Sequence, residues 1–341
     1  MNWLGKKSST IIVAMLMIIH FDVSFTQELN ESPPTATEST LTTTESPPTT
    51  TESSTTTTES PTENTDLFRE QPFSYNEEDY YEVLYNDYRK CRKDFAQFRR
   101  SRYFRFCNLP PHTKLPKEFD LRKLKVIPPV RNQKRCNASW AFGPLGAVES
   151  ALIHRFHLPH RHFQLSTQEL VDCAGNQGCR GGVDVTQAFS YLMEKGVVTE
   201  FEYPYKARQG KCQERKHRHQ YHVRIKDYCG ICPHTVPILK SFIYHYKRPL
   251  TTILHIRNRR AYNRLGIYAV DEDFGNKVRH RHVVNIVGWG YHHRGNISYW
   301  IVKNSMGLHW GHKGYAFVDI DSDEFEIRKN NFYFRLGRPE F

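Results

Sequence analysis

The stretch of sequence that decides the fold is Val130-Arg131-Asn132-Gln133-Lys134-Arg135-Cys136-Asn137-Ala138-Ser139-Trp140-Ala141-Phe142. Its last residues open an apolar run whose spacing predicts a helix over residues 139–157. Similar spacing predicts helices over 166–173 and 185–195. Helices that precede strands along the chain predict an α+β fold with two halves. Short runs rich in aromatic and β-branched residues predict these strands, over 283–287, 299–303, 315–318 and 332–334.

Further blocks follow this stretch in order. They are Gln168-Glu169-Leu170-Val171-Asp172-Cys173 with Gly178-Cys179-Arg180-Gly181-Gly182, then His282-Val283-Val284-Asn285-Ile286-Val287-Gly288-Trp289-Gly290, then Tyr299-Trp300-Ile301-Val302-Lys303-Asn304-Ser305. Together with residues 130–142, these blocks resemble the papain-type cysteine proteases, above all the group 1 mite allergens. The resemblance runs from about residue 115 to the C-terminus. It implies a papain-like fold, with a helical left domain over 115–227 and a β-rich right domain over 228–334.

The resemblance also implies roles for the residues at the centre of these blocks. Gln133 would donate a hydrogen bond to the oxyanion, His282 would be the base, and Asn304 would orient its imidazole. Ser139 takes the position of the nucleophilic cysteine. A thiol there would ionise, because an imidazolium and a helix N-terminus stabilise a thiolate, whereas a hydroxyl forms no comparable anion. The substrate cleft would include Trp140, Gly181, Gly182 and Met306.

Four other departures from the family pattern accompany Ser139. Met306 stands where the family has a tryptophan that shields the His–Asn pair, and Asn137 replaces a glycine in the substrate-facing loop. Pro144 removes a backbone donor early in the helix, and Arg281 with its basic neighbours disfavours an imidazolium. We therefore predict a catalytically inactive member of the family, with a weak serine-dependent peptidase as the alternative.

The chain has eight cysteines, and an even number is typical of a disulfide-bonded protein outside the cytosol. The resemblance implies three pairs. One cysteine upstream and one in the body remain, and we hypothesise that these two also pair. The implied pairs are Cys136–Cys179, Cys173–Cys212 and Cys107–Cys229, and the hypothesised pair is Cys91–Cys232.

The sequence divides into four regions. Residues 1–26 have two lysines and a short apolar run, which predicts a secretory signal peptide, or else an uncleaved anchor. Residues 27–65 are almost entirely Thr, Ser, Glu and Pro, typical of a mucin-like, O-glycosylated segment or of a plain disordered spacer. Residues 66–106 form a pro-like segment with a helix expected over 80–98. Residues 107–341 form the peptidase domain.

Three Asn-X-Ser sequences are candidate N-glycosylation sites, at Asn30, Asn296 and Asn137. A sugar on Asn137 would block the cleft, unless the folded cleft hides this residue from modification. Histidines gather over residues 154–162 and 217–222, but no carboxylate pattern accompanies them. We therefore predict neither a metal site nor a cofactor.

The formal net charge is +12, and residues 27–65 carry seven Glu with no Lys, Arg or Asp. The globular part is therefore more basic than the chain as a whole. Such a body attracts acidic glycans if its charge is concentrated, and is merely a soluble basic protein if its charge is dispersed. We predict no specific nucleic-acid binding and no membrane-spanning segment.

These features together predict a secreted, extracellular papain-like homologue that binds an unidentified protein or peptide ligand without cutting it. Such a decoy would engage protease inhibitors or the defence proteins of a host. One alternative is a weak peptidase that uses Ser139 and His282. Another is a basic glycan- or surface-binding protein.

Overall fold

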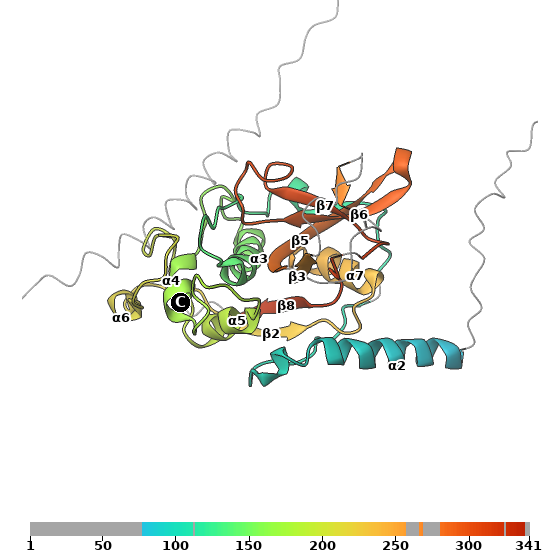
Figure 1. Ribbon diagram of the computed structural model, residues 1–341, viewed down its shortest axis with the longest axis horizontal. Coiled ribbons are helices and arrows are strands. Elements are labelled where there is room, and N and C mark those ends of the chain that lie inside the picture. Colours follow the sequence, from blue (N-terminus) through green and yellow to red (C-terminus); the bar gives the residue numbers. More distant parts are fainter. Residues whose placement is uncertain (1–76, 112, 257–265, 269–279, 324, 338–341) are drawn as a thin grey trace, which may run out of the picture. The chain divides into compact units, whose positions relative to one another are not determined.

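One sheet contains all eight strands of the described residues (Figure 1). The computed structural model describes residues 77–111, 113–256, 266–268, 280–323 and 325–337. Within them the strand order is β2-β8-β3-β5-β6-β7-β4, and β1 pairs with β5 beside this path. The bounds are β1 (Phe119–Asp120), β2 (Ile225–Gly230), β3 (Leu250–Ile256), β4 (Ile267–Tyr268), β5 (His280–His292), β6 (Ile297–Lys303), β7 (Tyr315–Asp319) and β8 (Asn331–Leu336).

The longer helices lie mainly before the sheet in sequence, so the α+β prediction is confirmed. The α-helices are α2 (Glu77–Asp94), α3 (Ser139–Phe156), α4 (Thr167–Cys173), α5 (Val185–Glu194), α6 (Glu214–His217) and α7 (Val236–Tyr246). Short 3-10 turns are η1 (Phe98–Arg100), η2 (Leu121–Leu124) and η3 (His293–Gly295).

Most elements predicted from the sequence lie within a few residues of their expected bounds, but three of the longer elements were missed. These are β2, α7 and β3, and β3 is buried along nearly its whole length, so it shows no alternation of polar and apolar residues. The helix expected over 80–98 ends at Asp94. The chain turns there because Phe95 and Phe98 are both buried, at 0% and 1% exposed.

Helix α3 packs closely against β5, the strand that carries His282. A Cβ atom at Gly143 would lie 2.6 Å from Cγ1 of Val283, so only glycine permits this approach. Asn285 of β5 also donates its Nδ2–H to the carbonyl oxygen of Gly143 at 3.0 Å. The helix continues through Pro144 to Phe156 despite the missing backbone donor. These contacts hold residue 139 and residue 282 on neighbouring elements.

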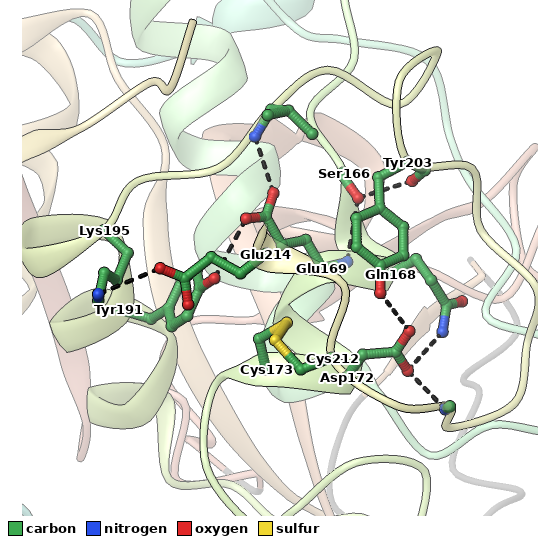
Figure 2. Close-up of a disulfide and its surroundings, with 12 residues drawn as sticks. Ser166, Gln168, Glu169, Asp172, Cys173, Tyr191, Lys195, Tyr203, Cys212 and Glu214 are labelled. Carbon is green, nitrogen blue, oxygen red and sulfur yellow. Dashed lines mark hydrogen bonds and ion pairs between the residues drawn. A yellow bond between two sulfur atoms is a disulfide. The ribbon is translucent and has the colours of Figure 1, made fainter. Parts of the chain in front are cut away.

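Helix α4 carries a buried carboxylate that joins it to the following segments (Figure 2). Ser166 caps the helix by accepting the N–H of Glu169 at 3.0 Å. Glu169 is fully buried and accepts from the Val198 N–H at 2.9 Å and the Tyr191 hydroxyl at 3.1 Å. The disulfide Cys173–Cys212 beside it ties the helix end to the loop before α6.

The structure contains four disulfides among the described residues. The one between Cys91 and Cys232 links helix α2 to the segment between β2 and α7. This bond joins the two cysteines that the family resemblance left without a partner, as hypothesised from the sequence. The other three pairs are Cys107–Cys229, Cys136–Cys179 and Cys173–Cys212, as that resemblance implied.

The segment that follows α2 is part of the folded core. The rings of Phe95 and Phe98 each pack edge-to-face against the ring of Phe332 in β8. Their centroids lie 5.3 and 5.0 Å from the Phe332 centroid. Ser101 shares a 2.6 Å hydrogen bond with the Tyr228 hydroxyl. The carbonyl of Arg105 accepts the Gly230 N–H at 2.9 Å. Residues 95–106 therefore pack against β2 and β8 as a structural element of the body.

The Cys91–Cys232 bond has a direct consequence for proteolytic processing. Arg99 and Arg100 are exposed and form a dibasic sequence. We expect that cleavage after Arg100 leaves the upstream piece attached to the body, because Cys91 lies upstream of the cut and Cys232 downstream. Denaturing electrophoresis of the nicked protein should show one band without reductant and two bands with it. Two bands without reductant would show that the two cysteines are not bonded in the protein.

Candidate active site

Ser139 is the first residue of α3, so its backbone N–H has no acceptor within the helix. The residue is 4% exposed, and its Oγ accepts the backbone N–H of Val283 at 3.3 Å. In the described part of the chain, no hydrogen bond joins this oxygen to the His282 ring. The hydroxyl therefore lies at a positively polarised helix end, held by a main-chain donor of β5.

His282 of β5 and Asn304, the residue that directly follows β6, form a buried pair. Nε2 of His282 lies 2.7 Å from Oδ1 of Asn304, and the Ser305 N–H donates to the same oxygen at 2.7 Å. Because an amide oxygen only accepts, Nε2 carries the hydrogen, and Nδ1 of the neutral ring is left as the basic nitrogen. The ring thus has the tautomer that a general base facing residue 139 would need.

Burial lowers the pKa of the His282 imidazole below its usual value, the Asn304 hydrogen bond opposes this change, and His280 lowers the pKa further. The imidazole is therefore neutral at neutral pH. Burial lowers this pKa more than the basic neighbours do, although the sequence pointed to those neighbours. Among them, His280 contributes to the lowered pKa. The residues 277 and 279 of that basic run lie outside the described residues.

The Gln133 side chain is fixed from both ends. Its Oε1 accepts the Ser305 hydroxyl at 2.7 Å, and one Nε2 hydrogen is donated to the carbonyl of Cys136 at 3.0 Å. An amide nitrogen carries two hydrogens, so the second one remains available to a ligand. Together with the backbone N–H of Ser139, it forms a pair of donors suited to a carbonyl oxygen or an oxyanion.

A cavity of about 930 Å³ lies in front of these groups. Gly181 and Gly182 line it, as does Asn137. Trp140 and Met306 do not: Trp140 is fully buried and donates its Nε1–H to the Gly178 carbonyl, and Met306 is exposed to solvent. The lining residues are Gln97, Phe98, Arg100, Ser101, Gln133, Asn137, Ser139, Gln177, Arg180, Gly181, Gly182, Val183, Asp184, Thr186, Gln187, Ser190, His280, Arg281 and His282.

Comparison with known proteins assigns this arrangement to a family. A model described as papain family cysteine protease matches residues 115–334. The chain belongs to the papain family. Its resemblance to the papain-type proteases is thus confirmed, and the match begins downstream of the segment that the Cys91–Cys232 bond ties to the body.

Papain-family proteins of mites are among the relatives. The protein named Peptidase 1 of Psoroptes ovis is 37% identical over 63% of this chain and 64% of its own length. Peptidase 1 of Dermatophagoides farinae is 35% identical over the same shares. The chain spans a little less than two thirds of the length of these mite relatives. The solved structure of bromelain from Ananas comosus, in complex with the E64 inhibitor, matches 65% of this chain and 100% of that one, with 28% identity and a TM-score of 0.54.

The position where the papain family has a shielding tryptophan is held by Met306. This residue is 42% exposed, yet His282 and Asn304 are only 6% and 7% exposed. The His–Asn hydrogen bond is therefore buried without a large side chain at position 306. The departure at Met306 does not disrupt the pair.

The three candidate glycosylation sites differ in their surroundings. Asn30 lies outside the described residues. Asn296 ends the 3-10 turn η3 and is exposed. Asn137 is exposed at the cavity, whereas Ser139 of the same tripeptide is buried in the folded protein. Modification at Asn137 would therefore have to precede folding, and its sugar would lie in the cavity.

A buried charged cluster behind the active site was not predicted from the sequence. Glu149 of α3 is 1% exposed, accepts the Leu165 N–H at 2.8 Å and lies 3.5 Å from the guanidinium of Arg131. Burial lowers the pKa of the Lys303 ammonium to about 8, and the Glu149 carboxylate opposes this change. The sequence does contain one indication of this cluster, because Glu149 lies within the apolar run of residues 139–157, where a charged residue is buried only when it is paired.

The histidine clusters of the sequence do not form a metal centre in the described part of the chain. No group of three or more His, Cys, Asp or Glu side chains there could hold a metal ion. Likewise, none of the helices in that part is long and apolar enough to cross a membrane.

Proposed function

We propose that this papain-family protein is secreted and holds peptide segments in its cleft without hydrolysing them. Four disulfides support an oxidising environment outside the cytosol. The natural ligand would be a protein or peptide, with protease inhibitors and host defence proteins as candidates for a decoy of this kind. The names of the mite relatives describe peptidases, so the absence of turnover is a property proposed for this chain.

The observation that carries the proposal is the state of Ser139. A serine nucleophile needs a base that is hydrogen-bonded to it and takes its proton during attack. The Ser139 oxygen instead accepts the Val283 N–H, and no hydrogen bond joins it to His282. A thiol at this position would ionise before attack, whereas a hydroxyl does not. The groups that would bind a peptide, such as Gln133 and Gly181, are therefore present in the cleft, and the thiol nucleophile is absent.

One observation favours the alternative, a weak serine peptidase. The His282–Asn304 pair has the 2.7 Å geometry and the tautomer of a working base. A small shift of the Ser139 hydroxyl toward Nδ1 would complete a Ser–His–Asn arrangement. Turnover by such an arrangement would depend strictly on the Ser139 oxygen.

Comparison of the wild type with Ser139→Ala tests the proposal. Both purified proteins are incubated with fluorogenic peptides and with a denatured protein, and binding of an uncut peptide is measured in parallel. We expect equal, background-level hydrolysis and equal binding. Hydrolysis by the wild type that disappears in Ser139→Ala would refute the proposal and establish the weak peptidase.

A further inference from the structure

Three arginines from three separate elements line the cavity. Arg100 belongs to η1 in the segment upstream of the family match, Arg180 precedes Gly181, and Arg281 of β5 precedes His282. All three are exposed. Arg180 donates to the backbone carbonyl of Asn176 at 2.5 Å, a contact that positions the guanidinium without neutralising it.

The cavity offers these arginines little negative charge. Among the described lining residues, Asp184 is the one carboxylate. Both of its oxygens are occupied at the start of α5: Oδ1 accepts the N–H and hydroxyl of Thr186, and Oδ2 accepts Nε2 of Gln187 at 3.5 Å. Within the described part of the chain, Arg100, Arg180 and Arg281 have no ion-pair partner. The described lining of the cleft therefore carries a net positive charge.

The wall of the cavity also presents unpaired main chain. In the described residues no hydrogen bond involves the backbone N–H or C=O of Gly181 or Gly182. Main-chain groups without a partner can pair with an extended peptide, which gains affinity from the backbone and selectivity from its side chains. The free Nε2 hydrogen of Gln133 adds a donor for a peptide carbonyl. These features favour a polypeptide over a sugar chain as the occupant.

We propose that the cleft selects acidic peptide segments, whose carboxylates bind Arg100, Arg180 and Arg281 while their backbone pairs with Gly181 and Gly182. This inference rests on the proposed function, since a peptide must remain uncut to be held. Guanidinium groups suit it because they bind carboxylates through two parallel hydrogen bonds. The disulfide-linked upstream segment contributes one of the three, so the site extends beyond the part of the chain that matches the family.

The test measures binding of three labelled peptides of equal length to the full secreted chain. The peptides alternate Ser with Glu, Gln or Lys, and binding is followed by fluorescence anisotropy. We expect the Glu peptide to bind about tenfold more tightly than the Gln peptide, and the Lys peptide most weakly. Arg180→Gln and Arg281→Gln should each lower the affinity for the Glu peptide by about threefold to tenfold. Neither variant should change the affinity for the Gln peptide.

Arg215→Gln is the matched control, because Arg215 is an exposed residue of α6 that does not line the cavity. It removes the same charge and should change the affinity by less than about twofold. Equal weakening by Arg215→Gln and Arg281→Gln would overturn the inference in favour of diffuse charge. The inference would also be overturned if the protein binds a heparin fragment but none of the peptides, and if Arg281→Gln weakens that heparin binding.

Two further results separate this inference from the proposed function. Equal affinity for the Glu and Gln peptides would refute acidic selectivity and leave non-catalytic binding intact. Cleavage of a bound peptide by the wild type, lost in Ser139→Ala, would refute the proposed function itself.

Discussion

Replacement of Ser139 by cysteine should turn this protein into a measurable peptidase. The surroundings of residue 139 favour a thiolate: it begins α3, the Val283 N–H points to its side-chain atom, and the neutral His282 can take the thiol proton. Gln133 and the residue 139 N–H already form the donor pair for the oxyanion. We expect turnover of fluorogenic peptides at least about three powers of ten above the wild type, since loss of a nucleophile costs still more.

Two variants control this experiment. Ser139→Ala should stay at background, and Ser139→Cys combined with His282→Gln should lose the gained activity. The rate of thiol alkylation gives a readout that does not depend on substrate entry past residues 97–101. Slow alkylation of Ser139→Cys, at the rate of an ordinary thiol, would contradict the expectation. It would mean that the groups around position 139 no longer support cysteine chemistry.

Removal of the buried carboxylate of Glu149 should strongly destabilise the fold. Glu149→Gln leaves the buried ammonium of Lys303 without the carboxylate that stabilises its charge. Arg131 loses one of its two carboxylate partners and keeps its 2.5 Å ion pair with Glu200. A buried ion that loses its partner typically costs about 3 to 5 kcal/mol. We expect a loss in this range in the free energy of unfolding, measured by urea denaturation with the disulfides intact. Because Lys303 is the last residue of β6 and directly precedes Asn304, the same change should loosen the orientation of His282.

A double-mutant cycle separates lost charge pairing from general disruption of the core. Lys303→Met removes the ammonium and keeps an unbranched side chain that is one atom shorter. When it is combined with Glu149→Gln, the pair is gone from both sides, and the double variant should recover at least about 1 kcal/mol relative to the sum of the single losses. Strictly additive losses would show that Glu149 acts through packing and its hydrogen bond to Leu165, not through charge.

Motif and periodicity were sufficient for the fold class and for most elements near the site. The helix from Ser139, the strand that carries His282 and the strand that ends just before Asn304 follow from local spacing, because one buried face imposes a period that is visible in the sequence. Strand β3 was missed because it is buried along almost its whole length, and no such period remains. The end of the helix at Asp94 was missed because it depends on Phe95 and Phe98, whose side chains are buried in the core. The local spacing of residues does not contain that tertiary contact.

By itself the sequence determined the family, the order of its blocks and the oxygen that replaces a sulfur at residue 139, since each is a matter of residue identity. The tertiary structure alone decided that the Val283 N–H holds this oxygen, that Phe98 and Arg100 form part of the cleft wall, and that Glu149 is a buried counter-ion. These relations join residues that are distant in the chain. Their energies depend on burial and on distance between atoms, which packing sets and local spacing does not contain.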